Sequence, residues 1–159
     1  AGSHDGCPPR ETGNGVEGVR VWSPPVHRRS HWRRALDYAV LYPQFAWHMV
    51  RAGGVEAIVT MTDPPMHMLL APWAGWRAWR RIHWAQDVYP EAAAELGVIP
   101  PGGWLSRFLR SAANHALRRH DDLVVPGRCM KEALVRFGLS ARRIEVIPNW
   151  SPVTAATNE

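Results

Sequence analysis

The spacing of apolar residues changes repeatedly along the chain between the period of strands and that of helices. The alternating or short β-branched pattern of strands covers 16–23, 55–61, 80–86, 122–127 and 143–150. Helical spacing covers 31–53, 63–76, 90–97, 104–120 and 128–138. Pro43 predicts a bend in the first helix. This alternation predicts an α/β fold with a doubly wound, Rossmann-like parallel sheet that helices cover on both faces.

Small or polar residues follow the predicted strands at three points of the sequence. These are Thr62–Asp63, Gln86–Asp87 and Pro126–Gly127. Parallel strands place their carboxyl ends on one edge of a sheet, where ligands bind, so we expect these residues to share one rim. Asp63 is also placed to cap the helix predicted over 63–76, and Asp87 the helix over 90–97. Both interpretations of Asp87, capping and binding, remain open from spacing alone.

Length and composition indicate one globular domain. The chain has 159 residues, of which 46% are hydrophobic and 21% charged, and no apolar run approaches the roughly 20 residues of a membrane-spanning helix. Cys7 and Cys129 lie far apart and outside any Cys/His cluster, which argues against a disulfide framework or a zinc site. The polar N-terminus lacks the charged and apolar regions of a signal peptide. We therefore expect a reducing, cytoplasmic environment.

The net charge of +5 comes almost wholly from arginine, since Lys131 is the only lysine. This balance favours phosphates, lipid headgroups or nucleic acid, although codon composition alone also produces it. Tryptophan and arginine are interleaved over 27–38 and 73–84. Core packing accounts for the second cluster, whereas the first is typical of a membrane surface. Its members are Arg28, Arg29, Trp32, Arg33 and Arg34.

Two patterns suggest dinucleotide binding and metal binding, but their neighbouring residues do not support either function. Gly13, Gly15 and Gly18 match a dinucleotide fingerprint, but a polar segment precedes them and a strand follows, so we predict a loop. His67 between two methionines is more typical of packing than of a metal site. The sequence contains no HExxH helix and no GxSxG elbow, so it gives no support to ordinary hydrolase chemistry.

Three segments in order carry a resemblance to a known family. They are VEAIVTMTDPP (55–65), HWAQDVYPEAAAELGVI (83–99) and DDLVVPGRCMKEALVRFGLSARRIEVIPNW (121–150). Together they resemble the N-terminal, acceptor-side domain of family 4 glycosyltransferases of the GT-B fold, most closely the bacterial surface-polysaccharide branch. The resemblance covers most of the chain from about residue 15 to residue 150, and the ordered set is more specific than any single segment.

The resemblance implies a retaining transfer of sugar from a nucleotide sugar to a lipid-linked saccharide in polysaccharide biosynthesis. Many members have a His-Asp pair near the transferred sugar, where this chain has Gln86 and Asp87. Asp87 is therefore expected to orient an acceptor hydroxyl. Arg128 and the helix N-terminus are expected to meet phosphate, and Asn149 to mark the hinge. The substrate-binding residues implied are Gln86, Thr62, Asp63, Gly127, Arg128 and Asn149.

The resemblance also implies an organisation. We expect residues 1–150 to be a partial acceptor-side domain and 151–159 to begin an interdomain linker, with an opening strand before residue 1 and a donor-binding domain after residue 159. No metal or other cofactor is expected, since no DxD motif occurs. The expected location is cytoplasmic, peripheral on the inner face of the membrane, with no nucleic-acid partner. The alternative function is a non-enzymatic basic α/β module that binds anionic membrane or single-stranded nucleic acid.

Overall fold

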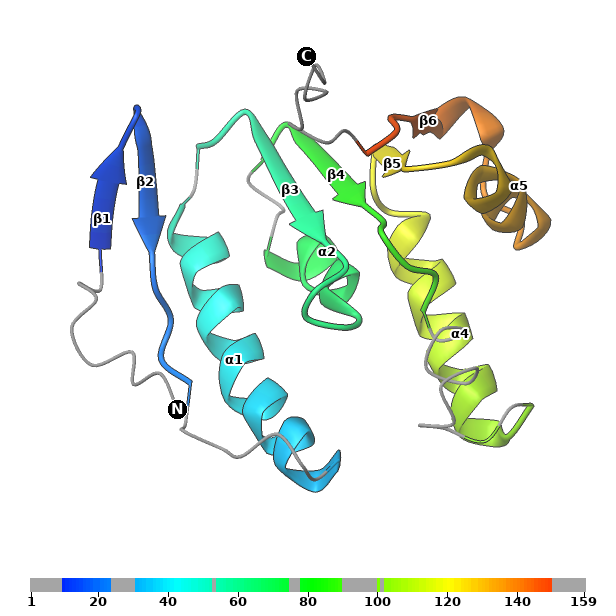
Figure 1. Ribbon diagram of the computed structural model, residues 1–159, viewed down its shortest axis with the longest axis horizontal. Helices are drawn as coiled ribbons and strands as arrows, with labels where there is room; N and C mark the ends of the chain where they lie inside the picture. The colour runs from blue at the N-terminus through cyan, green and yellow to red at the C-terminus, as the bar shows by residue number, and fades with distance from the viewer. Residues whose placement is uncertain are drawn as a thin grey trace, which may run out of the picture. The chain divides into compact units, whose positions relative to one another are not determined.

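The computed structural model describes residues 10–23, 31–52, 54–74, 78–89, 100 and 102–149, excluding the side chains of 31–35, 73 and 74. Within it the chain forms two compact units, residues 1–51 and 52–159. Figure 1 shows the helices and strands of both units. Each unit is described by itself.

The first unit contains a β-hairpin that the apolar pattern only half predicted. β1 (Arg10–Gly13) pairs antiparallel with β2 (Val16–Val19). Asn14 and Gly15, with φ of 51° and 79°, form the two-residue turn between them. Positive φ at both positions is the geometry that hairpin turns prefer. A strand, not a helix, comes directly after the turn, so rejection of the dinucleotide fingerprint is confirmed. The loop predicted for the glycines is wrong, because Gly13 and Gly18 lie in β1 and β2, and β1 itself was not predicted.

A long helix, α1 (His31–Arg51), follows in the same unit and contains Pro43, as predicted. The side-chain amide of the next residue, Gln44, makes three hydrogen bonds. Its Nε2 donates to the Val40 carbonyl at 2.9 Å and to the Trp22 carbonyl at 2.8 Å, while its Oε1 accepts from the Trp22 N–H at 3.0 Å. Ser23 also bonds to Asp37. The chain beyond β2 is therefore attached to the helix by the backbone of Trp22 and the side chain of Ser23.

The second unit is built on a parallel sheet in the order β3-β4-β5-β6. These strands are β3 (Ala57–Met61), β4 (Arg80–Trp84), β5 (Asp122–Val125) and β6 (Ile144–Val146). Each neighbouring pair is parallel. All four strands were expected, and each is shorter than its apolar run: β3 begins two residues later, whereas the pairing of β4, β5 and β6 ends before the loop. The predicted α/β class with a Rossmann-like parallel sheet is confirmed.

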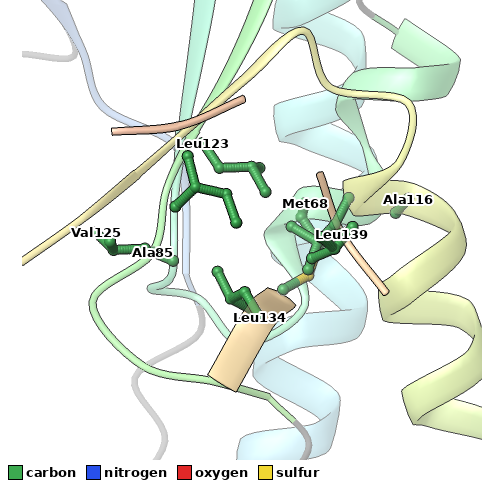
Figure 2. Close-up of a cluster of buried hydrophobic side chains, with 9 residues drawn as sticks. Met68, Ala85, Ala116, Leu123, Val125, Leu134 and Leu139 are labelled. Carbon is green, nitrogen blue, oxygen red and sulfur yellow. The ribbon is translucent and has the colours of Figure 1, made fainter. Parts of the chain in front are cut away.

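Helices pack against one face of this sheet and complete the core of the unit. They are η1 (His67–Leu69), α2 (Ala71–Ala74), α4 (Trp104–Leu117) and α5 (Arg128–Arg136). A short exposed turn, η3 (Ala141–Arg143), connects α5 to β6. Figure 2 shows apolar side chains from η1, α4 and α5 meeting those of the strands, among them Met68, Leu123, Val125 and Leu134. Each of these four is at most 2% exposed. This burial fixes which strand residues face the helices.

A glycine after α5 and an aspartate before β5 stabilise the ends of these elements. Gly138, with φ of 81°, follows α5, and a Cβ there would lie 2.8 Å from the Arg118 side chain. Glycine is thus favoured by both conformation and space. At the amino edge of the sheet, Asp121 accepts hydrogen bonds from the Arg81 N–H at 2.8 Å and from its Nε at 3.3 Å. These contacts hold the start of β5 beside β4.

The segment after β3 corrects one prediction. We expected a helix over 63–76 capped by Asp63, but residues 63–66 form bends and turns, and the helical residues are only those of η1 and α2. The N-cap of η1 is Met66, whose φ of 63° lies in the left-handed region. A right-handed helix cannot run through that conformation. Asp63 is exposed and caps no helix. The helix predicted over 90–97 lies outside the described residues.

Candidate functional site

A threonine at the end of β3 organises the carboxyl edge of the sheet. Thr62 is 3% exposed, and its Oγ1 accepts hydrogen bonds from the backbone N–H of Gln86 at 2.7 Å and of Asp87 at 3.4 Å. The same hydroxyl donates to the Trp84 carbonyl at 3.4 Å. One side chain of β3 therefore fixes the path of the loop that leaves β4. A hydroxyl suits this position because it accepts and donates at once.

The segment that follows β6 is joined to the same loop through a side-chain amide. Nδ2 of Asn149, which lies beyond β6, donates to Oε1 of Gln86 at 3.1 Å. The two residues are separated by 63 positions in the chain. Thr62, Gln86 and Asn149 thus lie in one hydrogen-bonded series along the carboxyl edge, which we call the carboxyl rim. The predicted meeting of Thr62 and Gln86 on one rim is found in the structure, and Asn149, which was expected to mark the hinge, joins them there.

The two aspartates of the rim differ in how the structure holds them. Asp87 has its backbone N–H on Thr62, while its side chain is exposed. Asp63 is also exposed, in the bend after Thr62. Because residues 90–99 lie outside the described part of the chain, the capping interpretation of Asp87 remains a prediction. The geometry leaves the Asp87 carboxylate available to a molecule in solution.

The rim extends to the start of α5. Gly127 is the N-cap of this helix in an extended conformation, its carbonyl accepting from the Lys131 N–H at 3.2 Å. Arg128, the first helical residue, is exposed. It also lines an open groove of about 710 Å³ along α5, together with Lys131, Glu132, Val135, Arg136, Ala141 and Val146. Backbone N–H groups and arginine at a helix N-terminus suit an anion, the chemistry expected for Arg128.

Directly beneath the rim lies a buried polar cluster that the sequence reading missed. Thr60, His83 and His120 are each at most 1% exposed. Thr60 Oγ1 lies 2.9 Å from His83 Nδ1 and 3.4 Å from His120 Nε2, and His120 Nδ1 lies 2.9 Å from the Ala116 carbonyl. Since a carbonyl only accepts, His120 carries its proton on Nδ1 and presents Nε2 as an acceptor to Thr60. We call these three residues the histidine cluster.

Both histidines of this cluster are held in the neutral form. Burial, with smaller contributions from the rings of His120 and His67, lowers the pKa of His83 to about 3. Burial likewise lowers the pKa of His120, against its hydrogen bond with the Ala116 carbonyl. His83 Nε2 is buried without a hydrogen-bond partner among the described residues. A charged imidazole is therefore strongly disfavoured at this depth. Strand alternation, which places His83 on the face of Ala85, was the available sequence signal.

The predicted membrane cluster falls mostly outside the described structure. Arg28 and Arg29 precede the described residues of α1, and Trp32, Arg33 and Arg34 lie in its first turns with side chains that are not described. Their role stays a prediction. No helix among the described residues is both long and apolar enough to cross a membrane. Those residues also contain no group of three or more His, Cys, Asp or Glu side chains arranged to hold a metal ion.

Comparison with known proteins gives one informative match. No curated protein and no solved structure matches the chain significantly. The family model described as "Glycosyl transferase 4-like domain" matches residues 1–150, which include the whole carboxyl rim. This match agrees with the parallel sheet and with the resemblance carried by the three segments. The chain belongs to the family of glycosyl transferase 4-like domains.

Proposed function

We propose that this chain is the acceptor-side half of a GT-B glycosyltransferase. In this proposal the enzyme moves a sugar, with retention, from a nucleotide sugar to a lipid-linked saccharide in polysaccharide biosynthesis. The family match supports glycosyl transfer in general. The observation that carries the assignment of the site is the Thr62 hydroxyl, which holds the backbone of both Gln86 and Asp87. It places an exposed carboxylate at the edge where α/β sheets bind ligands.

The proposal gives the rim residues separate tasks. The Asp87 carboxylate accepts a hydrogen bond from the acceptor hydroxyl that attacks, and so orients its oxygen towards the transferred sugar. Gln86 has its Oε1 engaged by Asn149, which leaves the two N–H groups of its Nε2 directed to a neighbouring sugar hydroxyl. Holding a nucleophile in place supplies a large part of the rate acceleration in group transfer. Asn149 and Thr62 act by positioning.

Charge on the leaving diphosphate needs cationic or dipolar partners. Arg128 and the N-terminus of α5 lie at the same edge and supply both, as N–H groups and as a guanidinium. Because the sequence has no DxD motif, the proposal assigns this task to the protein and to the donor-binding half rather than to a metal. The chain of 159 residues is accordingly expected to bind acceptor but to transfer no sugar by itself.

The test is a comparison of two ligands by isothermal titration calorimetry. The chain is titrated with a short-chain polyprenyl diphosphate monosaccharide, as acceptor analogue, and with a nucleotide sugar. The proposal predicts saturable binding of the acceptor analogue, weakened by about tenfold in Asp87→Asn, and much weaker binding of the nucleotide sugar. Glu145→Gln, an exposed carboxylate on β6, is the matched control and should bind as the parent does. Tighter binding of the nucleotide sugar would contradict the acceptor-side assignment.

A further inference from the structure

The first turns of α4 present bulky apolar side chains to solvent. Trp104 is 81% exposed and Phe108 is 63% exposed. They are separated by four residues and so lie on one face of the helix. Leu105 beside them is 36% exposed, whereas the opposite face of the helix holds the buried residues Ser106 and Ala113. This outward face, made by Trp104, Leu105 and Phe108, is called the aromatic face.

The charged side chains that α4 itself places beside the aromatic face are of one sign. Arg107 is exposed beside it, and Arg110 follows with its guanidinium 5.7 Å from the centre of the Phe137 ring. The helix contains no aspartate or glutamate. A second copy of the chain docked through the same face would bring Arg107 close to its symmetry mate with no carboxylate of the helix between them. The surface is therefore complementary to an anionic partner rather than to itself.

The position of the aromatic face in the unit relates it to the carboxyl rim. β4 and β5 are parallel neighbours, so α4 between them must run back antiparallel to both. Its first turn consequently lies at the end of the sheet where the strands finish. Figure 1 shows α4 beginning beyond the carboxyl ends of β3 and β4. Trp79, which precedes β4 and is 87% exposed, lies at the opposite, amino edge, so the core packing predicted for the cluster of 73–84 is wrong for this residue.

We propose that the aromatic face of α4, with Arg107, is a docking surface for an anionic lipid bilayer. Tryptophan and phenylalanine partition into the headgroup region, and arginine adds attraction to anionic lipids. A partly exposed helix with these two properties on one side lies flat on a membrane. Where the proposed function holds, this docking brings the carboxyl rim to the depth at which a lipid-linked saccharide leaves the bilayer. Docking itself requires no catalysis.

The experiment is flotation of the 159-residue chain with vesicles of phosphatidylcholine that contain about one third phosphatidylglycerol. The double variant Trp104→Ala, Phe108→Ala should lower the partition constant for the vesicles, obtained from the bound fraction, by about tenfold. Trp79→Ala is the matched control, since it removes an equally exposed tryptophan from the amino edge, and it should change binding by less than about twofold. Circular dichroism of each variant establishes that the fold is intact.

Charge is tested separately with Arg107→Glu. This variant should weaken binding to the anionic vesicles by about tenfold and leave the weaker binding to pure phosphatidylcholine unchanged. The proposal is overturned if Trp79→Ala loses as much binding as the α4 variant, or if the α4 variant binds as the parent does. It is equally overturned if the aromatic face instead supports dimerisation or binding of a single-stranded oligonucleotide. Because no turnover is measured, failure here leaves the acceptor-binding test standing.

Discussion

Thr60 and Thr62 lie two residues apart on the same face of β3, and they use the same hydroxyl group for different purposes. Thr60 is enclosed by the rings of His83 and His120, at 1% exposure. Thr62, at 3%, accepts from two backbone N–H groups of the loop that ends in exposed Asp87. One strand thus supplies a hydroxyl to the buried histidine cluster through Thr60 and another to the carboxyl rim through Thr62.

The hydrogen-bond partners of each threonine determine whether its hydroxyl contributes to stability or to ligand binding. The partners of Thr60 are imidazoles that no water reaches, so their loss leaves buried polar atoms unsatisfied. The partners of Thr62 are at the edge, where water replaces a lost hydrogen bond, and what suffers is the placement of Asp87. We therefore expect changes in the histidine cluster to act on stability, and changes in the carboxyl rim to act on ligand binding.

Acid should act first on the histidine cluster. The pKa of His83 is about 3 in the folded chain, against about 6.5 for an ordinary histidine, so between those values the unfolded chain binds a proton that the folded chain does not. The contribution of His83 to stability is therefore full well above pH 6.5 and is lost as the pH falls towards 3, by up to about 1.4 kcal/mol per pH unit. His120 acts in the same direction, since its pKa is also lowered. Denaturation at several pH values measures this slope.

Two further groups modify the acid response. Burial lowers the pKa of His67 too, against the opposing effect of the Asp63 charge. Protonation of His67 therefore adds to the loss of stability as the pH falls below the ordinary histidine pKa. Burial raises the pKa of Asp121, but hydrogen bonds from Arg81 outweigh it and lower the pKa, so that stability is lost below the usual carboxyl value. His115→Gln, at an exposed position of α4, is the control. A slope that His115→Gln removes, or that the parent lacks, would contradict the account.

Thr60→Val tests the cluster without a change of shape. The variant should lower the free energy of unfolding by about 3 kcal/mol, because both imidazoles lose their shared hydroxyl in a site closed to water. Denaturant titration at neutral pH gives the value. Acceptor binding by the folded fraction should remain within about twofold of the parent, since the rim is untouched. Full stability in this variant would show that the hydroxyl is not needed between the rings.

Thr62→Val makes the same substitution in the carboxyl rim itself. We expect a smaller loss of stability, about 1 kcal/mol, because Gln86 is only partly buried and Asp87 is exposed. Acceptor binding should weaken by about fivefold, as the loop is no longer held in place. Titration of the two valine variants with the acceptor analogue separates the roles. If Thr60→Val weakened binding more than Thr62→Val, the assignment of stability to the histidine cluster and of binding to the carboxyl rim would be wrong.

The smallest effect is expected for the amide pair of the rim. Asn149→Ala removes the 3.1 Å hydrogen bond to Gln86 Oε1 at an exposed position, so stability should change by about 0.5 kcal/mol or less. A double-mutant cycle with Gln86→Ala, measured by acceptor binding, should give a coupling of about 0.5 kcal/mol. Additive effects of the two variants would mean that the pair does not shape the site.

Much of the sheet was predictable because apolar runs between turn residues mark buried strands. The parallel arrangement of β3, β4 and β5 followed from the helices between them, and the sharing of one edge followed from that. Which side chains bond there was not predictable. The contact of Gln86 with Asn149 joins residues 63 apart, and its geometry depends on the lengths of two loops.

The failures have separate physical causes. β1 is a polar strand, RETG, defined by pairing and by its Asn-Gly turn rather than by apolar alternation. The segment after Asp63 has helical spacing, but the left-handed Met66 restricts it to one short 3₁₀ turn and α2. The histidine cluster was missed because His83 and His120 belong to separate elements, and only the fold brings them to one hydroxyl.

The most direct test of the central claim is turnover by the full-length protein carrying Asp87→Asn. If the Asp87 carboxylate orients the acceptor hydroxyl, the amide should lower kcat/KM by about tenfold or more, with unfolding unchanged. Glu145→Gln, measured beside it, should retain the parent rate, because this exposed carboxylate of β6 lies outside the rim. An Asp87→Asn enzyme as active as the Glu145→Gln control would contradict the assignment of the carboxyl rim as the acceptor site.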